Sequence, residues 1–269
     1  MEAVKVSVCI PTYNGARDIA TTLDYIKAQT YDNIEIIVTD DCSDDDTVKI
    51  IEERYPEVIV RINEKRLGLT GNWNRAVSLA TGKYIKLMGQ DDIIGPDTIR
   101  LQVEALEQHP NASMCIGQTD VINVDGSKMM TRKLANKDFC CDGKKFARKS
   151  LWYRNIYCEP SNVLYRADIQ IPYNSDYIYV PDWDHNIAVS LHGDVYYVAQ
   201  KLMDFRVSNS SETSRLYRSK MNIMNEDHDR LINAYRKELK IPVWQYLFFR
   251  FSVRMRTLIR YIFIHIKVR

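Results

Sequence analysis

The six cysteines of this 269-residue sequence do not show the paired spacing of a zinc site. They are Cys9, Cys42, Cys115, Cys140, Cys141 and Cys158. Cys9 lies inside an apolar run that is typical of a buried strand. We therefore expect the cysteines to be reduced thiols, as in a cytoplasmic protein.

Apolar runs long enough to cross a bilayer are also missing. The apolar segment 243–269 is interrupted by arginine too often to span a membrane. An apolar strand starts within a few residues of Met1, which leaves no room for a signal peptide. The expected location is therefore the cytoplasm, with any membrane association peripheral and on the cytoplasmic face.

A glycine-rich phosphate loop carrying lysine or arginine is absent after the first apolar run, where Pro11-Thr-Tyr-Asn-Gly15 stands instead. This absence argues against a nucleotidyltransferase. With 45% apolar residues, the chain is long enough to bury a full core. We expect one large α/β domain with a C-terminal appendage.

Strands alternate with helices along the first hundred residues. Apolar runs at 4–10, 34–39, 58–62 and 84–88 predict four strands, and helices are expected between them at 17–29, 47–54 and 70–80. This alternation is typical of βαβ units. It predicts an α/β fold with a mostly parallel central sheet flanked by helices.

Turn-forming or acidic residues follow three of these strands. They are Pro11 to Gly15, the pair Asp40 and Asp41, and the pair Asp91 and Asp92. Because parallel strands end at one edge of a sheet, these residues should converge there. Two adjacent carboxylates repel each other, and a hard divalent cation relieves that repulsion.

Helix capping is the alternative explanation for these aspartates. Ser43 or Asp44 would cap the helix that starts at Thr47, and Asp91 and Asp92 would form a turn before the helix near Pro96. Asp40 and Asp41 come too early to act as a cap. From the residues alone, the cap and the metal site remain equally good interpretations of Asp91 and Asp92.

The ordered motifs resemble those of family 2 glycosyltransferases. They are Val6-Ser-Val-Cys-Ile-Pro-Thr-Tyr-Asn-Gly15, Glu35-Ile-Ile-Val-Thr-Asp-Asp-Cys-Ser-Asp-Asp-Asp-Thr47, Gly68 with Asn74, Ala80-Thr-Gly-Lys-Tyr-Ile85 and Gln90-Asp-Asp-Ile93. The resemblance implies a GT-A-type nucleotide-sugar-binding fold. It also implies a divalent metal, Mn²⁺ or Mg²⁺, and inverting transfer of a sugar from a nucleoside diphosphate donor such as a UDP-sugar.

Roles for individual residues follow from the resemblance. Pro11, Thr12 and Tyr13 would line the nucleoside pocket. Asp41 would accept a hydrogen bond from the base, and Asp91 would contact the ribose. Asp92 would hold the metal on the diphosphate, where a cation neutralises the charge of the leaving group.

Two departures from the family pattern lie in this first half. Gly89 stands where many members have an additional aspartate, and Trp73 stands where many have an arginine. The second departure removes a phosphate or positioning contact. Lys65, Arg66 and Arg75 are the candidates to replace it.

The second half carries the expected general base. Helix 97–108 and a strand at 112–124, interrupted by Gly117, are followed by a polar, basic and irregular stretch at 127–155. The segment 159–166 resembles the strand that leads the family's acceptor region. Asp182 aligns with the family's catalytic base, although Pro181 replaces the acidic residue that usually precedes it.

Two structural alternatives bear on this half. Asp182 or Asp184 could cap a helix at 183–191. Arg206 matches a family arginine and would contact the diphosphate or, more simply, pair with Asp204 or an interior carboxylate, while Ser208 replaces a histidine. The stretch 208–214 would be a mobile lid over the donor.

We expect a catalytic domain at 1–215, with halves 1–110 (nucleotide sugar) and 111–215 (acceptor), and a helical appendage at 216–269.

The C-terminal segment forms a basic amphipathic helix. It has six cations and no Asp or Glu, and one helical stripe is apolar: Trp244, Phe248, Phe251, Met255, Ile259, Ile262 and Ile266. Three uses are open, namely an anionic membrane surface, packing or dimerisation through the apolar stripe, and nucleic-acid binding, which no motif supports.

The acceptor would be a saccharide or a lipid-linked sugar in surface polysaccharide or glycolipid assembly. The alternative is a non-catalytic nucleotide-sugar-binding scaffold.

Overall fold

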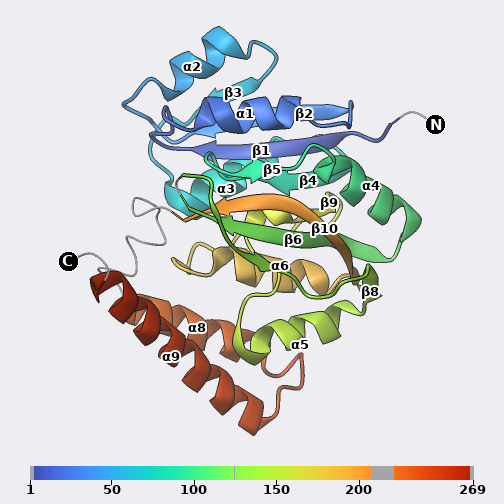
Figure 1. The fold of residues 1–269 in the computed structure, drawn as a ribbon, viewed down its shortest axis with the longest axis vertical. Coiled ribbons are helices and arrows are strands. Elements are labelled where there is room, and N and C mark those ends of the chain that lie inside the picture. Colours follow the sequence, from blue (N-terminus) through green and yellow to red (C-terminus); the bar gives the residue numbers. More distant parts are fainter. Residues whose placement is uncertain (1–2, 124, 208–220, 267–269) are drawn as a thin grey trace.

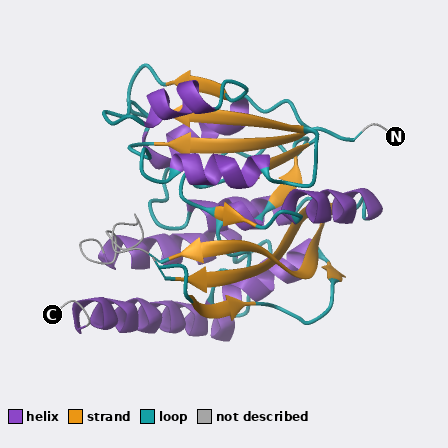
Figure 2. Ribbon diagram, turned by 45° about the horizontal axis from the view of Figure 1, so that its top comes forward, coloured by secondary structure: helices purple, strands orange, loops and turns teal. Residues whose placement is uncertain are grey.

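The structure is a computed structural model of the chain and describes residues 3–123, 125–207 and 221–266. Its centre is a ten-stranded sheet. Eight strands follow the order β3-β2-β1-β4-β9-β6-β10-β5, and the other two, β7 and β8, pair with β6 and β10. Helices cover both faces of this sheet, and the long strands point the same way (Figures 1 and 2).

The first half of the chain builds parallel strands joined by helices. The strands are β1 (Val6–Thr12), β2 (Ile34–Asp40), β3 (Ile59–Ile62) and β4 (Tyr84–Leu87). The helices are α1 (Ile19–Lys27), α2 (Thr47–Arg54) and α3 (Gly68–Ser78). Both β2 and β4 pair with β1 in parallel, and β3 pairs with β2 in parallel. Each predicted element of this half is therefore present.

The second half is mixed in direction. It contains β5 (Ile93–Ile94), α4 (Thr98–Gln108), β6 (Ala112–Ile122), β7 (Lys128–Arg132), β8 (Phe139–Cys141), α5 (Gly143–Tyr153), the 3-10 turn η1 (Pro160–Asn162), β9 (Leu164–Arg166), α6 (Pro181–Ser190) and β10 (Asp194–Arg206). The long strands β6 and β10 pair in parallel, whereas β5, β7, β8 and β9 pair antiparallel. Most paired residues are thus parallel, as predicted.

Hydrophobic cores lie on the two faces of the sheet because successive residues of a strand point to opposite sides. In β1, Val6, Val8 and Ile10 belong to one core, and Cys9 belongs to the other. These side chains are completely buried. The strand therefore reads as a continuous apolar run, which is typical of a strand covered on both faces.

Several predictions for the second half were wrong. The stretch 127–155, expected to be irregular, contains β7, β8 and α5. The strand β6 continues through Gly117, where a Cβ would lie 2.5 Å from the Leu202 side chain, so a close neighbour explains this glycine. The end of the predicted strand at Val124 lies outside the described residues.

Two helices follow the sheet, α8 (Met221–Tyr235) and α9 (Val243–Ile266). Together with α5 they form one end of the molecule, opposite the end that carries α2 and β3 (Figure 1). The expected domain boundary at 215/216 lies outside the described residues. Among the described helices, none combines the length and apolar character needed to cross a bilayer.

Candidate active site

The carboxyl ends of β1, β2 and β4 bring the predicted residues to one edge of the sheet. The Thr12 hydroxyl lies 3.1 Å from the Asp40 carboxylate, and the Asp41 amide donates to the Thr12 carbonyl at 2.9 Å. Pro11 precedes them in β1 and is in register with Thr39 of β2. The parallel sheet thus accounts for the convergence of the first two motifs.

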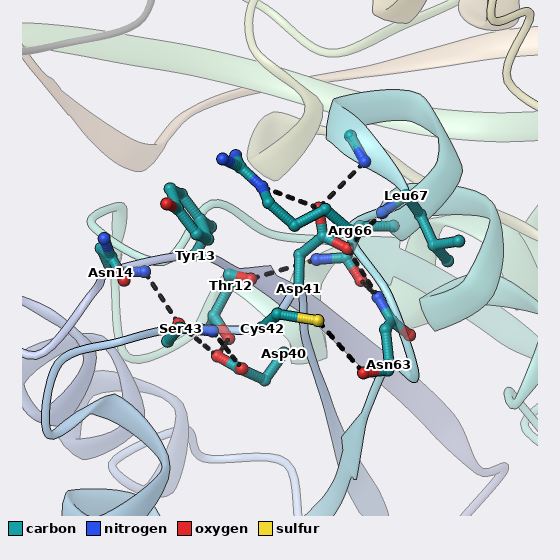
Figure 3. A network of polar contacts seen from close by, with 12 residues as sticks. Thr12, Tyr13, Asn14, Asp40, Asp41, Cys42, Ser43, Asn63, Arg66 and Leu67 are labelled. Carbon is teal, nitrogen blue, oxygen red and sulfur yellow. Dashed lines mark hydrogen bonds and ion pairs between the residues drawn. The ribbon is translucent and has the colours of Figure 1, made fainter.

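Asp41 is buried among donors from the segment between β3 and α3 and from the start of α3 (Figure 3). Its carboxylate accepts hydrogen bonds from the amides of Leu67 and Gly68, at 2.7 and 2.9 Å, and from the Asn63 side chain at 2.9 Å. The carboxylate therefore fixes the amino end of the helix that carries Trp73 and Asn74. The role of Asp41 toward a base stays a prediction.

Arg66 covers the face of Tyr13. Its guanidinium carbon lies 3.6 Å from the ring centroid, and its Nε lies 4.0 Å from Asp41 Oδ2 (Figure 3). Among the three predicted replacements for the family arginine, Arg66 is the one with a contact to predicted site residues. Trp73 packs edge-on against Tyr173, so this position is used for packing.

Gln90 is a residue that the sequence did not single out. Its side-chain oxygen accepts from the Tyr13 amide at 2.9 Å, and its side-chain nitrogen donates to the Tyr13 carbonyl at 3.2 Å. This paired contact joins the β1 motif to the Asp91 and Asp92 loop. Its position next to Asp91 was the signal that could have identified it.

Asp91 and Asp92 form a strongly acidic centre. Burial, and then the charge of Asp91, raise the pKa of Asp92 to about 7. Burial and the nearby Asp18 raise the pKa of Asp91, while Arg206 lowers it. Carboxylates with raised pKa values lack compensating positive charge, so this centre favours a cation.

The protein oxygens at this centre fit a divalent metal held together with a diphosphate. A Cβ at Gly89 would lie 2.7 Å from Asp92 Oδ2 and 3.4 Å from Asp91 Oδ1, so the two carboxylates fill the space beside this glycine. The described residues contain no cluster of three or more His, Cys, Asp or Glu side chains suited to a metal. Two carboxylates with substrate oxygens are a usual arrangement for Mg²⁺.

Arg206 lies beside this centre. It pairs with Asp18 at 3.6 Å, whereas Asp204 pairs with Lys201 at 3.1 Å. Of the two partners predicted for Arg206, Asp204 or another carboxylate of the fold, the structure has the second, Asp18, which is the N-cap residue of α1. Ser208 and the expected lid at 208–214 lie outside the described residues.

Asp182 lies in the first turn of α6. The N-cap residue of this helix is Val180, so neither Asp182 nor Asp184 caps it, and the capping alternative was wrong. The Asn155 side chain donates to Asp182 Oδ2 at 3.1 Å. Burial, together with the charge of Glu159, raises the pKa of Asp182 to about 7.

The caps predicted for α2 were wrong as well. Asp46 occupies the N-cap position, without a side-chain hydrogen bond. The Ser43 amide donates to Asp40 at 2.8 Å, and the Asp44 amide donates to the Asn14 side chain at 3.0 Å. These residues tie the second motif to the first.

Comparisons with known proteins agree with this geometry. The family described as Glycosyl transferase family 2 matches residues 7–171. A relative from Escherichia coli, UDP-Glc:alpha-D-GlcNAc-diphosphoundecaprenol beta-1,3-glucosyltransferase WfgD, is 31% identical over 46% of this chain and 49% of its own length. The chain therefore spans about half the length of that curated relative.

Solved structures show the same fold. The S. aureus TarS 1–349 complex with UDP has a TM-score of 0.63, with 20% identity over 90% of this chain and 76% of that chain. The mannosyltransferase PcManGT from Pyrobaculum calidifontis, in complex with GDP-Man and Mn²⁺, has a TM-score of 0.62, with 16% identity over 98% of this chain and 74% of that chain. The family match over more than half of the sequence and the shared GT-A-type fold identify this chain as a member of glycosyltransferase family 2.

Proposed function

We propose that this protein is an inverting glycosyltransferase that moves a sugar from a nucleoside diphosphate donor, a UDP-sugar, to a saccharide or lipid-linked acceptor. The observation that carries the proposal is the pairing of two acidic centres within a family 2 chain. Asp91 and Asp92 stand at the sheet edge, and Asp182 stands at the start of α6. Separate acidic groups for the leaving group and the acceptor are what an inverting displacement requires.

The residues divide the work by position. Pro11, Thr12 and Tyr13 line the nucleoside pocket, and Asp41 accepts a hydrogen bond from the base, as an imide N–H of uracil would supply. Asp91 contacts the ribose. These roles are supported by the shared edge of β1, β2 and β4 and by the contact of Gln90 with Tyr13.

Asp92, with Asp91 beside it, would hold Mn²⁺ or Mg²⁺. When bound, the cation supplies neutralising charge to the leaving diphosphate. Asp182 takes the proton of the acceptor hydroxyl, and a carboxylate whose pKa is raised to about 7 is a stronger base than an ordinary aspartate. Arg206, which lies close enough to Asp91 to lower its pKa, adds a positive charge toward the diphosphate.

The choice of donor and acceptor is supported by what the relatives are named for. WfgD is named for UDP-glucose and a diphosphoundecaprenol-linked acceptor, and TarS was solved with UDP and with UDP-GlcNAc. We infer a role in surface polysaccharide or glycolipid assembly on the cytoplasmic face of the membrane. A lipid-linked acceptor places the active site at a bilayer surface.

The face of α9 that points away from the protein supports that location. On the side of α9 that faces the protein, the buried residues are spaced four apart: Gln245, Phe249, Val253 and Thr257. The large exposed side chains lie on the opposite side of the helix: Trp244, Leu247, Phe248, Phe251, Met255, Leu258, Ile259 and Ile262. Among the described residues, most of the predicted apolar stripe is thus exposed, and two of its members, Trp244 and Phe248, meet Trp152 of α5. The side chain of Ile266 lies outside them.

We assign this face, which we call the outer face of α9, to an anionic bilayer. Trp152 of α5 extends it and meets Trp244 at 5.3 Å and Phe248 at 6.4 Å. The exposed cations Lys145, Arg148 and Lys149 of α5 lie nearby on the same end of the molecule. Aromatic rings flanked by cations are typical of a helix lying in a membrane interface.

Calorimetric titration with UDP and GDP, with and without Mn²⁺, tests the donor site. We expect UDP binding that requires Mn²⁺ and is lost in Asp92→Ala. Asp182→Asn should bind UDP as the wild type does and release no product from any UDP-sugar and acceptor that the wild type uses. Near-normal turnover by Asp182→Asn would remove this residue as the base. Binding of a UDP-sugar without turnover for any acceptor would indicate a non-catalytic scaffold.

A further inference from the structure

A short segment between α5 and β9 touches both acidic centres. At its start, Asn155 Nδ2 donates to Asp182 Oδ2 at 3.1 Å. At its end, the Ser161 hydroxyl donates to Asp92 Oδ2 and accepts from the Gly89 amide at 3.0 Å. We call residues 155–161 the bridging segment. It joins two carboxylates that come from different elements, the loop after β4 and helix α6.

The conformation of the bridging segment is fixed by its own hydrogen bonds. The Asn155 side-chain oxygen accepts a hydrogen bond from the Tyr157 amide at 3.0 Å, and its side-chain nitrogen donates to the Cys158 carbonyl at 3.2 Å. Cys158 has a φ of +65°, a left-handed conformation that side chains other than glycine rarely adopt. A backbone held in this way persists only where its surroundings determine it.

The segment is also anchored in the core. Tyr157 and Ser161 are completely buried, and the Tyr157 hydroxyl lies 2.9 Å from the Ser190 hydroxyl at the far end of α6. The following Asn162 exchanges hydrogen bonds with the backbone of Gly117 in β6, at 3.1 and 3.0 Å. The two carboxylate contacts are therefore made from a rigid support.

Glu159, in the middle of the segment, acts electrostatically on both centres. Its charge raises the pKa of Asp92 and that of Asp182. One carboxylate oxygen of Glu159 is bound by Arg132 of β7. A single charge that acts on both carboxylates must lie within reach of each of them.

We propose that the bridging segment sets the position of the base carboxylate Asp182 relative to the metal carboxylate Asp92, with Asn155 and Ser161 as the positioning residues at its two ends. The proposal rests on the roles proposed above for Asp92 and Asp182. An amide holds a carboxylate oxygen without competing for its proton, and a hydroxyl does the same in the ionised state. Outer contacts of this kind orient the groups that bind metal or transfer protons.

The Asn155 end is tested by NMR titration of isotope-labelled aspartate in the metal-free protein. The Asp182 signal is assigned from its loss in Asp182→Asn. Because the Asn155 hydrogen bond favours the ionised carboxylate, Asn155→Ala should raise the pKa of Asp182 by about one pH unit. Tyr157→Phe is the matched control, since it removes a buried hydrogen bond of the same segment and touches neither carboxylate.

The Ser161 end is tested by calorimetry with UDP and Mn²⁺. Ser161→Ala should weaken Mn²⁺-dependent UDP binding by about tenfold, and Tyr157→Phe should leave it unchanged. An unmoved Asp182 titration in Asn155→Ala, or an equal shift in Tyr157→Phe, would overturn the proposal. If the wild type binds no UDP at all, the proposed function fails, and the titration alone then decides whether the segment positions Asp182.

Discussion

Gly89 shows how one missing side chain shapes the acidic centre. A Cβ at this position would lie 2.7 Å from Asp92 Oδ2, which is closer than real Cβ contacts allow. The carboxylate would have to move, and its hydrogen bond with Ser161 would be lost. The departure from the family pattern is thus coupled to the way in which this chain places Asp92.

We predict that Gly89→Ala weakens Mn²⁺-dependent UDP binding by about tenfold, because it displaces a proposed metal ligand. Calorimetry measures this loss. Gly95→Ala, on the other side of β5, is the control, since its Cβ would meet Thr98 Oγ1 at an ordinary 3.5 Å. Equal binding by wild type and Gly89→Ala would show that Asp92 is not fixed by this contact.

The raised pKa of Asp182 predicts a pH dependence of stability. Its folded-state value of about 7 is above the usual value of 3.8, so the folded protein holds a proton that the unfolded chain releases. The contribution is fully present below about pH 4 and is lost as the pH rises through about 7. Thermal unfolding without metal should therefore show a smaller loss between pH 5 and pH 8 in Asp182→Asn than in the wild type. A parallel loss in both would contradict the prediction.

At the scale of the elements, sequence patterns were sufficient where local signals agree. Helix α2 was predicted with the bounds Thr47–Arg54 that the structure has, and the four strands of the first half lie where their apolar runs are. The strands β7 and β8 were missed because their own sequences lack a clear strand pattern. They form by pairing with β6 and β10.

The contacts within the site were beyond sequence reasoning for the same reason. Ser161 lies 69 residues from Asp92, and Asn155 lies 27 residues from Asp182. Motifs bring each carboxylate to the correct strand or helix end. They carry no signal for the polar side chain that an unrelated segment places against it, so Asn155 and Ser161 could be found only in the folded chain.

Helix α9 carries apolar residues of two kinds, buried and exposed. Phe249 is completely buried, whereas Phe251 is 64% exposed. We predict that Phe249→Ala lowers the free energy of unfolding by about 3–5 kcal/mol, since it leaves a cavity between α9 and the domain. Phe251→Ala should change it by less than about 0.5 kcal/mol. Urea unfolding of the two variants measures the difference, and similar losses would mean that both faces of α9 are covered.

At the scale of the whole molecule, three helices at one end carry an exposed apolar face. α5, α8 and α9 share one end of the molecule (Figure 1). The side chains of the outer face of α9 are exposed. Eight large apolar side chains exposed along one helix face are typical of an interaction surface. Two of the arginines of α9, Arg250 and Arg254, are bound to Asp229 of α8. In the proposed membrane orientation, the cations of α5 would therefore add to those of α9.

We predict that the protein binds vesicles containing phosphatidylglycerol, and that the double variant Trp244→Ala/Phe251→Ala binds at least about tenfold more weakly, since two interfacial aromatic side chains are lost. Raising the salt concentration should weaken binding without abolishing it, because the apolar contribution is not screened. Met129→Ala, which removes an exposed apolar side chain from β7, is the control. Vesicle sedimentation measures binding, and light scattering measures mass in solution. If the wild type is a dimer that does not bind vesicles, and the double variant is a monomer, the outer face of α9 would instead bind a second copy of the chain.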